Sequence, residues 1–250
     1  MAKLKHLSLR EEIIETCLKM NEDGINQGTS GNVSARIDGG FLITASGVPY
    51  HKMKPHHIVE MDFEGRYIGD YLPSTEWRMH MDIFKHRKEA GAIVHTHSIY
   101  ATALACLRKD IPPFHYMIGI GGGTTIRCSD YAEFGTQALS DVMLKALEDR
   151  SACLLGNHGQ IAFGPNLEKA LWRAGEVETI SHQYWAALQA GTPVLLNDEQ
   201  MTTVLARFKT YGKQSDELGK DEAHAVFAPV RVDVPKKDKK KVKKKVKKAK

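Results

Sequence analysis

The sequence predicts an α/β fold, in which helices cover a largely antiparallel or mixed central sheet. Apolar residues at helical spacing alternate with short strand-like runs along the chain, and several of those runs follow one another with no helix between them. Strands joined by short turns pair in an antiparallel manner, because a parallel pair needs a long crossover. No glycine-rich loop of the nucleotide-binding kind stands between a strand and a helix, so a nucleotide fold is not expected.

The first half of the chain predicts a strand-rich region between helices. A helix begins at Ser8, which forms a capping box with Glu11, and ends at Gly24. Glycine-bounded apolar runs then predict strands, followed by two helices that flank one further strand. In order, these elements are strands within 28–37, 39–47 and 57–69, a helix at 75–87, a strand at 92–97 and a short helix at 100–107.

The second half predicts a strand pair among longer helices. With 250 residues and 42% hydrophobic side chains, the chain has enough apolar surface for the core of one domain. The predicted elements are strand pieces at 116–120 and 124–128, a helix at 133–149, a strand pair within 152–164, and helices at 167–190 and 198–209.

The net charge of +5 is divided unevenly along the chain. Residues 236–250 hold 11 Lys and one Asp, or +10, which leaves 24 basic and 29 acidic residues, or −5, in residues 1–235. A lysine block cannot bury apolar surface and repels itself, so we expect one domain over 1–228 and a disordered lysine-rich tail over 229–250. Such a tail either binds anionic surfaces weakly or only improves solubility. The rest of the chain has no basic stripe with interleaved aromatics, so specific nucleic-acid binding is not expected.

No segment of the sequence predicts a membrane span or an export signal. No window approaches 18 uninterrupted apolar residues, and the start "MAKLKHLSLREEII" lacks the apolar core of a signal peptide. We therefore expect a cytoplasmic protein without a transmembrane segment. The cysteines, Cys17, Cys106, Cys128 and Cys153, form no CxxC pair, which favours reduced thiols in the core.

Two histidines, His95 and His97, stand at the end of the apolar run "GAIVHTH". Residues two apart on a strand point to the same face, so both rings can offer a nitrogen to one metal ion. The pair alone is equally consistent with core histidines that hydrogen-bond to the backbone.

Glu76 and His158 extend this candidate metal site. Glu76 lies in the first turn of the helix predicted at 75–87, and His158 lies at a tight strand junction. Three imidazoles and a carboxylate suit a borderline divalent cation, zinc above all, and a three-histidine site is typical of a catalytic zinc. The following histidines occur singly or on polar faces and are not expected to be ligands: His6, His51, His56, His57, His80, His86 and His182.

The sequence resembles the class II aldolase/adducin family in several places: Glu76, His95, His97 and His158, and the segments "QGTSGNVS", "TASG" and "PSTEW". The resemblance runs from about Leu9 to Tyr211 and includes "IPPFHYMI", "NLEKALW" and "FKTYG". It implies a class II aldolase/adducin-like fold and a metal-dependent aldehyde-lyase. The implied reaction cleaves a ketose 1-phosphate, of the L-fuculose 1-phosphate type, to dihydroxyacetone phosphate and an aldehyde through a metal-stabilised enediolate.

The resemblance also implies roles at the metal. His95, His97 and His158 are similar to the ligands of one zinc ion per subunit. Glu76 is similar to the acidic residue that contacts the metal and becomes the proton-abstracting base when substrate displaces it.

A phosphate site is implied in the same way. Residues on the motifs that hold the substrate phosphate in the family are Asn32, Ser46, Gly47, Ser74 and Thr75. Hydroxyl and amide side chains, with backbone N–H groups at glycine-rich turns and helix starts, suit that task. The alternative is that these residues only cap turns, as such residues often do.

Tyr116 and Tyr211 match family tyrosines that reach into the site from the neighbouring subunit of a homotetramer. Tyr116 is similar to the proton donor on the aldehyde side. The resemblance leaves open other sugar-phosphate substrates, because the family includes aldolases for 5-(methylthio)ribulose 1-phosphate and 5-deoxyribulose 1-phosphate. It also includes a methylthioribulose-phosphate dehydratase, sugar-phosphate epimerases and the non-enzymatic protein adducin.

Overall fold

The computed structural model describes residues 4–213 and 217–219. The chain forms two compact units, Met1–Lys209 and Thr210–Lys250. All of the helices and strands given below belong to the first unit. The predicted tail at 229–250 lies outside the described residues, so the boundary at 228 stays a prediction.

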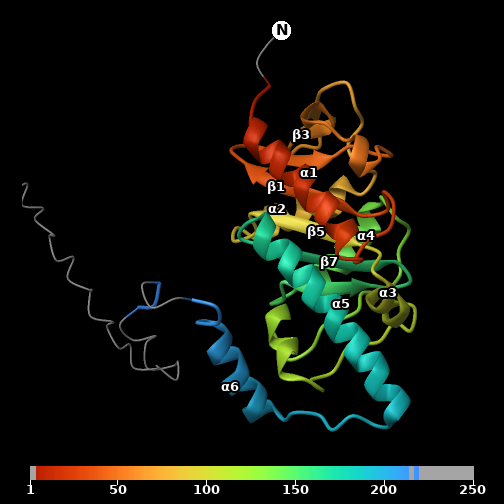
Figure 1. Ribbon diagram of the computed structural model, residues 1–250, viewed down its shortest axis with the longest axis vertical. Coiled ribbons are helices and arrows are strands. Elements are labelled where there is room, and N and C mark those ends of the chain that lie inside the picture. The colour runs from red at the N-terminus through yellow and green to blue at the C-terminus, as the bar shows by residue number, and fades with distance from the viewer. Residues whose placement is uncertain (1–3, 214–216, 220–250) are drawn as a thin grey trace, which may run out of the picture. The chain divides into compact units, whose positions relative to one another are not determined.

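An open sheet forms the centre of the first unit (Figure 1). Its seven strands among the described residues have the order β4-β3-β2-β1-β5-β7-β6, and all neighbours pair antiparallel. The predicted antiparallel sheet is therefore confirmed. The strands are β1 Asn32–Ile37, β2 Gly40–Thr44, β3 Ile58–Asp62, β4 Tyr67–Ile68, β5 Ala92–Thr96, β6 Ala152–Leu155 and β7 Gly159–Gly164.

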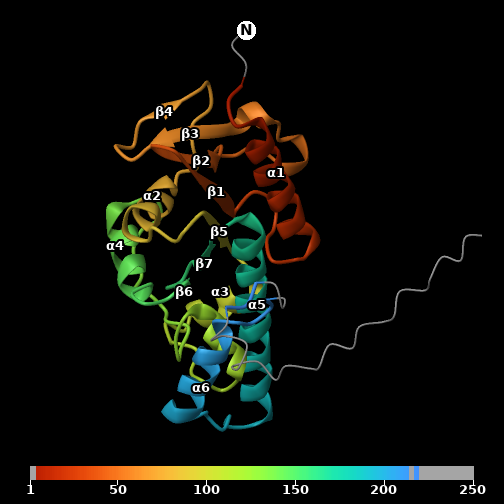
Figure 2. The ribbon, with the colours of Figure 1, turned by 90° about the vertical axis from the view of Figure 1, so that its left-hand side faces the viewer.

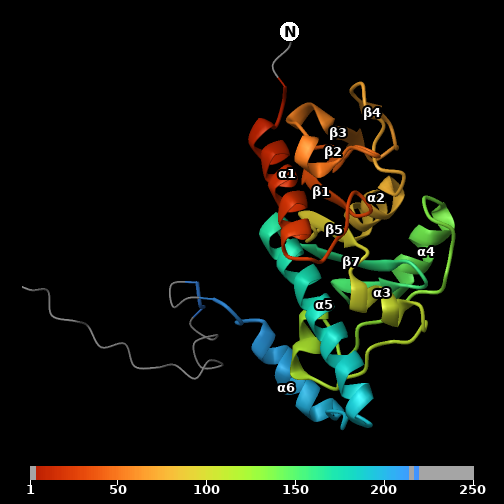
Figure 3. The same cartoon turned by 45° about the vertical axis from the view of Figure 1, so that its right-hand side comes forward.

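Helices cover both faces of this sheet. Figures 2 and 3 show α2 and α4 on one side of it and α1 and α5 on the other. The α-helices are α1 Leu7–Glu22, α2 Trp77–His86, α3 Ile99–Ala105, α4 Gln137–Ala146, α5 Leu167–Ala190 and α6 Asp198–Phe208. Three short 3₁₀ helices are η1 Tyr50–Lys52, η2 Pro55–His57 and η3 Tyr116–Gly121.

The alternation of side chains along β5 separates two hydrophobic cores. Ile93 packs in the core that includes α2 and α4, whereas Val94 packs in the core that includes α1, α3 and α5. Both side chains are fully buried, as expected for a strand covered on both faces. His95 continues the side of Ile93, because successive strand residues point to opposite faces.

Four local predictions are wrong. Residues 116–120 belong to the 3₁₀ helix η3 instead of a strand. This helix packs closely against α6, and a Cβ on Gly119 would lie 2.7 Å from the Phe208 ring. Residues 124–128 make only isolated bridges, at Ile126 and Cys128. Helix α1 begins before Ser8, with His6 at its N-cap, so the predicted capping box is absent. Helix α4 begins only after Thr136, whose side chain caps it by accepting from the Leu139 N–H.

The cysteine prediction holds only in part. All four thiols are free, and Cys17 and Cys153 are buried in the core, but Cys106 is exposed at the end of α3. Among the described residues, no helix combines the length and apolarity that a membrane crossing requires.

Gly91, directly before β5, lies in close contact with the backbone that follows β7. Its N–H donates to Gly164 and its carbonyl accepts from Arg36, so it links β5 to both neighbouring strands. A Cβ at Gly91 would lie 2.0 Å from the Pro165 carbonyl oxygen. The absence of a side chain here therefore lets β5 sit in register between β1 and β7.

We predict opposite effects of two glycine-to-alanine changes. Gly91→Ala forces backbone apart and should lower the free energy of unfolding by about 1–3 kcal/mol. Gly175→Ala lies within α5 with no atom near the added methyl group, and should raise it by about 0.5–1 kcal/mol. Urea unfolding followed by circular dichroism measures both. A Gly91→Ala variant as stable as the wild type would contradict the packing constraint.

Candidate active site

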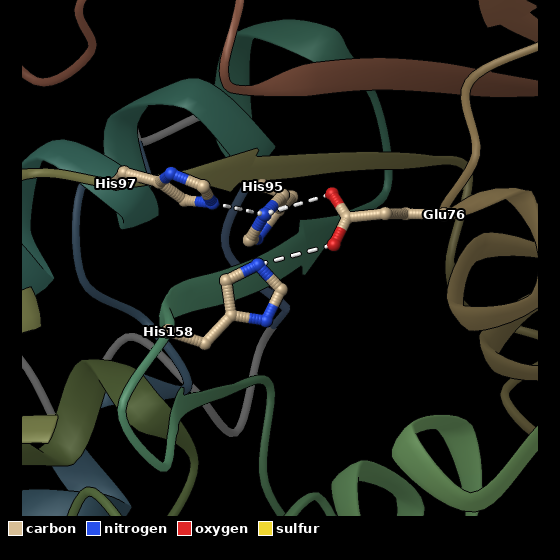
Figure 4. A group of neighbouring side chains, drawn as sticks. All are labelled: Glu76, His95, His97 and His158. Atoms are coloured by element: carbon tan, nitrogen blue, oxygen red, sulfur yellow. Dashed lines mark hydrogen bonds and ion pairs between the residues drawn. The ribbon is translucent and has the colours of Figure 1, made fainter. Parts of the chain in front are cut away.

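Four side chains from three parts of the sheet and its helices converge on one point (Figure 4). They are Glu76, His95, His97 and His158, and their ligand atoms all lie within 4.8 Å of one another. Glu76 precedes α2, His95 lies near the end of β5 and His97 directly follows that strand. His158 lies in the turn between β6 and β7. The structure thus brings together the whole metal set that the sequence predicted.

Strand pairing and the tight turn between β6 and β7 place the three histidines. His95 lies opposite Asn32 of β1 and Ile161 of β7. In the turn between β6 and β7, Asn157 has a positive φ of 54°, which helps the chain to reverse its direction. Gly159 follows, and a Cβ there would lie 2.9 Å from the His97 ring. The missing side chain lets His97 and His158 approach each other.

The spacing of the ligand atoms fits a small cation. His95 Nε2 lies 3.1 Å from His97 Nε2 and 3.2 Å from Glu76 Oε2, and His158 Nε2 lies 3.1 Å from Glu76 Oε1. Atoms bound to one tetrahedral zinc by bonds of about 2.0–2.1 Å lie about 3.3 Å apart. The four residues therefore need little movement to hold such an ion.

The hydrogen-bond partners also fit a metal. Nδ1 of His95 lies 2.8 Å from the Gln160 carbonyl oxygen, which only accepts, so Nδ1 carries the proton and Nε2 presents a lone pair to the cluster. The buried Oε1 of Glu76 accepts no hydrogen bond of good geometry from the described residues. A divalent cation would satisfy both of these atoms at once.

Burial and close charges shift the ionisation of the cluster. Burial favours the neutral form of Glu76, but His95 and His158 outweigh it and hold its pKa well below the usual range. Burial likewise opposes protonation of His95, yet the Glu76 carboxylate raises the pKa of that ring. Burial, together with the two neighbouring rings, lowers the pKa of His97 to about 4. An ionised carboxylate and a neutral imidazole are the forms in which these groups bind metals.

A small polar cavity adjoins the metal cluster and shares Glu76 with it. Its volume is about 70 Å³, several times the space that a single water needs. All five residues of the predicted phosphate site line it: Asn32, Ser46, Gly47, Ser74 and Thr75. We call this cavity, with these five residues, the cradle.

Backbone contacts hold the walls of the cradle in place. The Ser46 N–H donates to Leu72, and the Ser74 N–H donates to Thr44, which ties the end of β2 to the segment before α2. Gly47 has a positive φ of 69°, where glycine is favoured. No lysine or arginine is among the described residues that line the cavity, so an anion there meets N–H and hydroxyl donors.

The two predicted tyrosines are not part of the cluster. Tyr116 is half-exposed at the start of η3. Tyr211 is exposed and belongs to the second compact unit, so its relation to the metal ligands stays a prediction.

Sequence reasoning missed several residues of the site. Thr29, Ser30 and Gly31 also line the cradle, and their motif "GTSGN" was the available signal. His80 was assigned no role, although it is fully buried and hydrogen-bonded to Asn32. Its position four residues after Glu76, on the same helix face, was a signal that the sequence did contain.

Comparison with known proteins identifies relatives that this chain covers over nearly their whole length. L-fuculose phosphate aldolase of Escherichia coli K12 is 48% identical over 210 residues, which are 84% of this chain and 98% of the relative. A 5-methylthioribulose-1-phosphate/5-deoxyribulose-1-phosphate aldolase of Rhodospirillum rubrum is 46% identical over 82% of this chain and 93% of the relative.

Structure and sequence profile agree with these relatives. A solved L-fuculose 1-phosphate aldolase superposes with a TM-score of 0.80 at 38% identity, covering 84% of this chain and all of that one. The profile described as "Class II Aldolase and Adducin N-terminal domain" matches residues 11–185. The predicted resemblance is confirmed, and the chain belongs to the class II aldolase and adducin family.

Proposed function

We propose that this protein is a zinc-dependent aldolase that cleaves L-fuculose 1-phosphate, or a ketose 1-phosphate of that type, to dihydroxyacetone phosphate and an aldehyde. One observation carries the proposal: Glu76 belongs both to the four-residue metal cluster and to the wall of the cradle. A phosphate held in the cradle would thus place the neighbouring carbon atoms of the substrate beside both the carboxylate and the metal ligands.

The proposed roles follow from this arrangement. Glu76, His95, His97 and His158 hold the ion, which supplies Lewis-acid stabilisation for the negative charge that develops as the carbon–carbon bond breaks. In the direction of bond formation, Glu76, once substrate has displaced it from the ion, removes a proton from the hydroxymethyl carbon of dihydroxyacetone phosphate. The cradle binds and orients the phosphate, so that this carbon lies within reach of the carboxylate.

The remaining roles extend beyond the described cluster. We propose that Tyr116 gives a proton to the aldehyde oxygen and that Tyr211 contributes to the same side of the site. Both would come from a neighbouring subunit of a homotetramer, in which half-exposed Tyr116 would lie at an interface. The proposal also places the enzyme in the cytoplasm.

A second candidate substrate is supported by a specific observation. The methylthioribulose-phosphate relative is nearly as similar to this chain as the fuculose-phosphate relative is, at 46% against 48% identity. The candidate ligands and the cradle bind parts of the substrate that all these ketose 1-phosphates share. A role as a non-enzymatic binding protein has less support because all four candidate ligands are present, and a role as a dehydratase or an epimerase has less support because the similar relatives above are named aldolases.

We predict that turnover depends on a divalent ion. Dialysis against a chelator should abolish release of dihydroxyacetone phosphate, and one equivalent of zinc per subunit should restore it, because the proposed reaction needs an ion in the cluster to stabilise the charge that develops as the carbon–carbon bond breaks. His97→Ala should lose the bound metal, whereas the control His182→Ala should keep it. Full turnover by protein shown to be metal-free would contradict the proposal.

We predict that Glu76→Gln lowers turnover by about two to four orders of magnitude, the usual contribution of a positioned acid–base group. Three histidine ligands remain, so metal content should change little. The matched control is Glu168→Gln, an exposed position on α5. Steady-state turnover and atomic absorption measure the two effects. Near-normal turnover of Glu76→Gln would assign proton transfer to another residue.

We predict that L-fuculose 1-phosphate is the preferred substrate. Its kcat/KM should exceed those of 5-deoxyribulose 1-phosphate and 5-(methylthio)ribulose 1-phosphate by about tenfold or more, since a site built to hydrogen-bond hydroxyls rejects substrates that lack them. Release of dihydroxyacetone phosphate from each, followed by coupled reduction, provides the comparison. A higher kcat/KM for either pentulose phosphate would favour the second candidate.

A further inference from the structure

A buried chain of hydrogen bonds runs behind Glu76 and links α2 to β1. The Ser34 hydroxyl lies 2.6 Å from Nδ1 of His80, and Nε2 of His80 lies 2.5 Å from Oδ1 of Asn32. The Nδ2 of Asn32 then donates to Oε2 of Glu76 at 2.9 Å. Ser34 and His80 are fully buried, and Asn32 and Glu76 are 3% and 5% exposed.

Two regular spacings bring these four residues together. Asn32 and Ser34 are two apart on β1 and therefore share a face of the sheet. Glu76 and His80 are four apart at the start of α2 and share a face of the helix. That helix packs on the same side of the sheet, so the two pairs meet in the core.

The direction of every hydrogen bond in this chain follows from the carboxylate at its end. An ionised carboxylate only accepts, so Asn32 must present its NH₂ group to Glu76 and its carbonyl oxygen to His80. That oxygen also only accepts, so Nε2 of His80 must carry a proton. Burial lowers the pKa of His80 to about 3, which keeps the ring neutral and leaves Nδ1 bare to accept from Ser34.

We propose that His80 is a positioning residue, which fixes the amide of Asn32 so that its NH₂ group faces Glu76 and the cradle. If the amide turned over, its carbonyl oxygen would lie against a carboxylate oxygen, and the two would repel each other. Asn32 lines the cradle and bonds Glu76, so one amide orients the base and helps to bind phosphate. The inference rests on the proposed function in giving Glu76 and the cradle their roles.

The surroundings of His80 support a role beyond filling space. Its neighbours on α2, Met79 and Ile83, pack in an apolar core. A buried imidazole in such a core loses its hydration, and only its two hydrogen bonds offset that cost. One of these bonds joins Nε2 to Asn32, and the other, from Ser34 to Nδ1, holds the ring in the orientation that this requires.

Two substitutions separate the hydrogen bond from the packing. In His80→Phe the ring remains but the donor is lost, and kcat/KM should fall about 10- to 100-fold, the effect of one buried hydrogen bond to a working group. In His80→Gln the side-chain NH₂ can replace Nε2, and kcat/KM should stay within about threefold. Metal content should be unchanged in both. Equal losses in the two variants would overturn the proposal.

A control variant at the contact between α4 and α2 tests for general destabilisation of α2. Ser140→Ala removes the buried hydrogen bond from α4 to Asp82 of α2, at 2.6 Å, which lies outside the Asn32 chain. It should lower the melting temperature but leave kcat/KM within about twofold, since one such bond contributes about 1 kcal/mol to stability. A loss of kcat/KM as large as that of His80→Phe would show that α2 stability alone explains the effect.

A double-mutant cycle tests whether His80 acts through Asn32. In an Asn32→Ala background the amide is gone, so His80→Phe should cost less than about twofold in kcat/KM. The same 10- to 100-fold cost in both backgrounds would mean that His80 acts by another route.

Nuclear magnetic resonance supplies a measurement that needs no turnover. In protein labelled with ¹⁵N-histidine, the ring signals lost in His80→Gln should be those of a neutral imidazole with its proton on Nε2. A proton on Nδ1, or on both nitrogens, would overturn the proposal. Because this measurement uses the wild-type fold, it distinguishes failure of the inference from failure of the proposed aldolase activity.

Discussion

Antiparallel pairing of β5 with β1 on one side and β7 on the other decides where Asn32 and the three histidines of the site lie. The register places Asn32 beside His95, and His95 beside Ile161, the third residue of β7. A slip by one residue would turn His95 into the core beneath α5 and leave His158 without its partners. Gly91 matters for this reason: it directly precedes β5, the strand that carries His95, although it touches none of the ligands among the contacts described.

The Glu76 carboxylate takes part in three separate sets of contacts. It contacts His95 and His158, lines the cradle, and accepts from Asn32. A carboxylate that is almost completely buried stays ionised only where its partners stabilise the charge, and these partners are here two rings and one amide. The hydrogen bond from Asn32 to Oε2 can then keep the carboxylate oriented both when Glu76 contacts an ion and when substrate has displaced it.

In the proposed site, the two ends of a ketose 1-phosphate would meet different sets of residues. Residues of the cradle and the cluster would hold the phosphate and the neighbouring carbon atoms, which the fuculose and pentulose substrates share. Relatives named for either substrate are almost equally similar to this chain. Discrimination must therefore come from residues that meet the distal end of the sugar, and we propose that Tyr116 and Tyr211 belong to that group.

Sequence alone determined those features that depend on spacing along one element. The HxH pair at the end of the strand predicted at 92–97 indicated a shared metal site, and the helix predicted from Leu167 to about Ala190 matches α5, because its apolar spacing is a local feature. The conformation of 116–120 and the role of His80 were decided by tertiary structure. A glycine that must admit the Phe208 ring, and an imidazole whose partners come from β1, differ from ordinary residues only after distant segments have packed together.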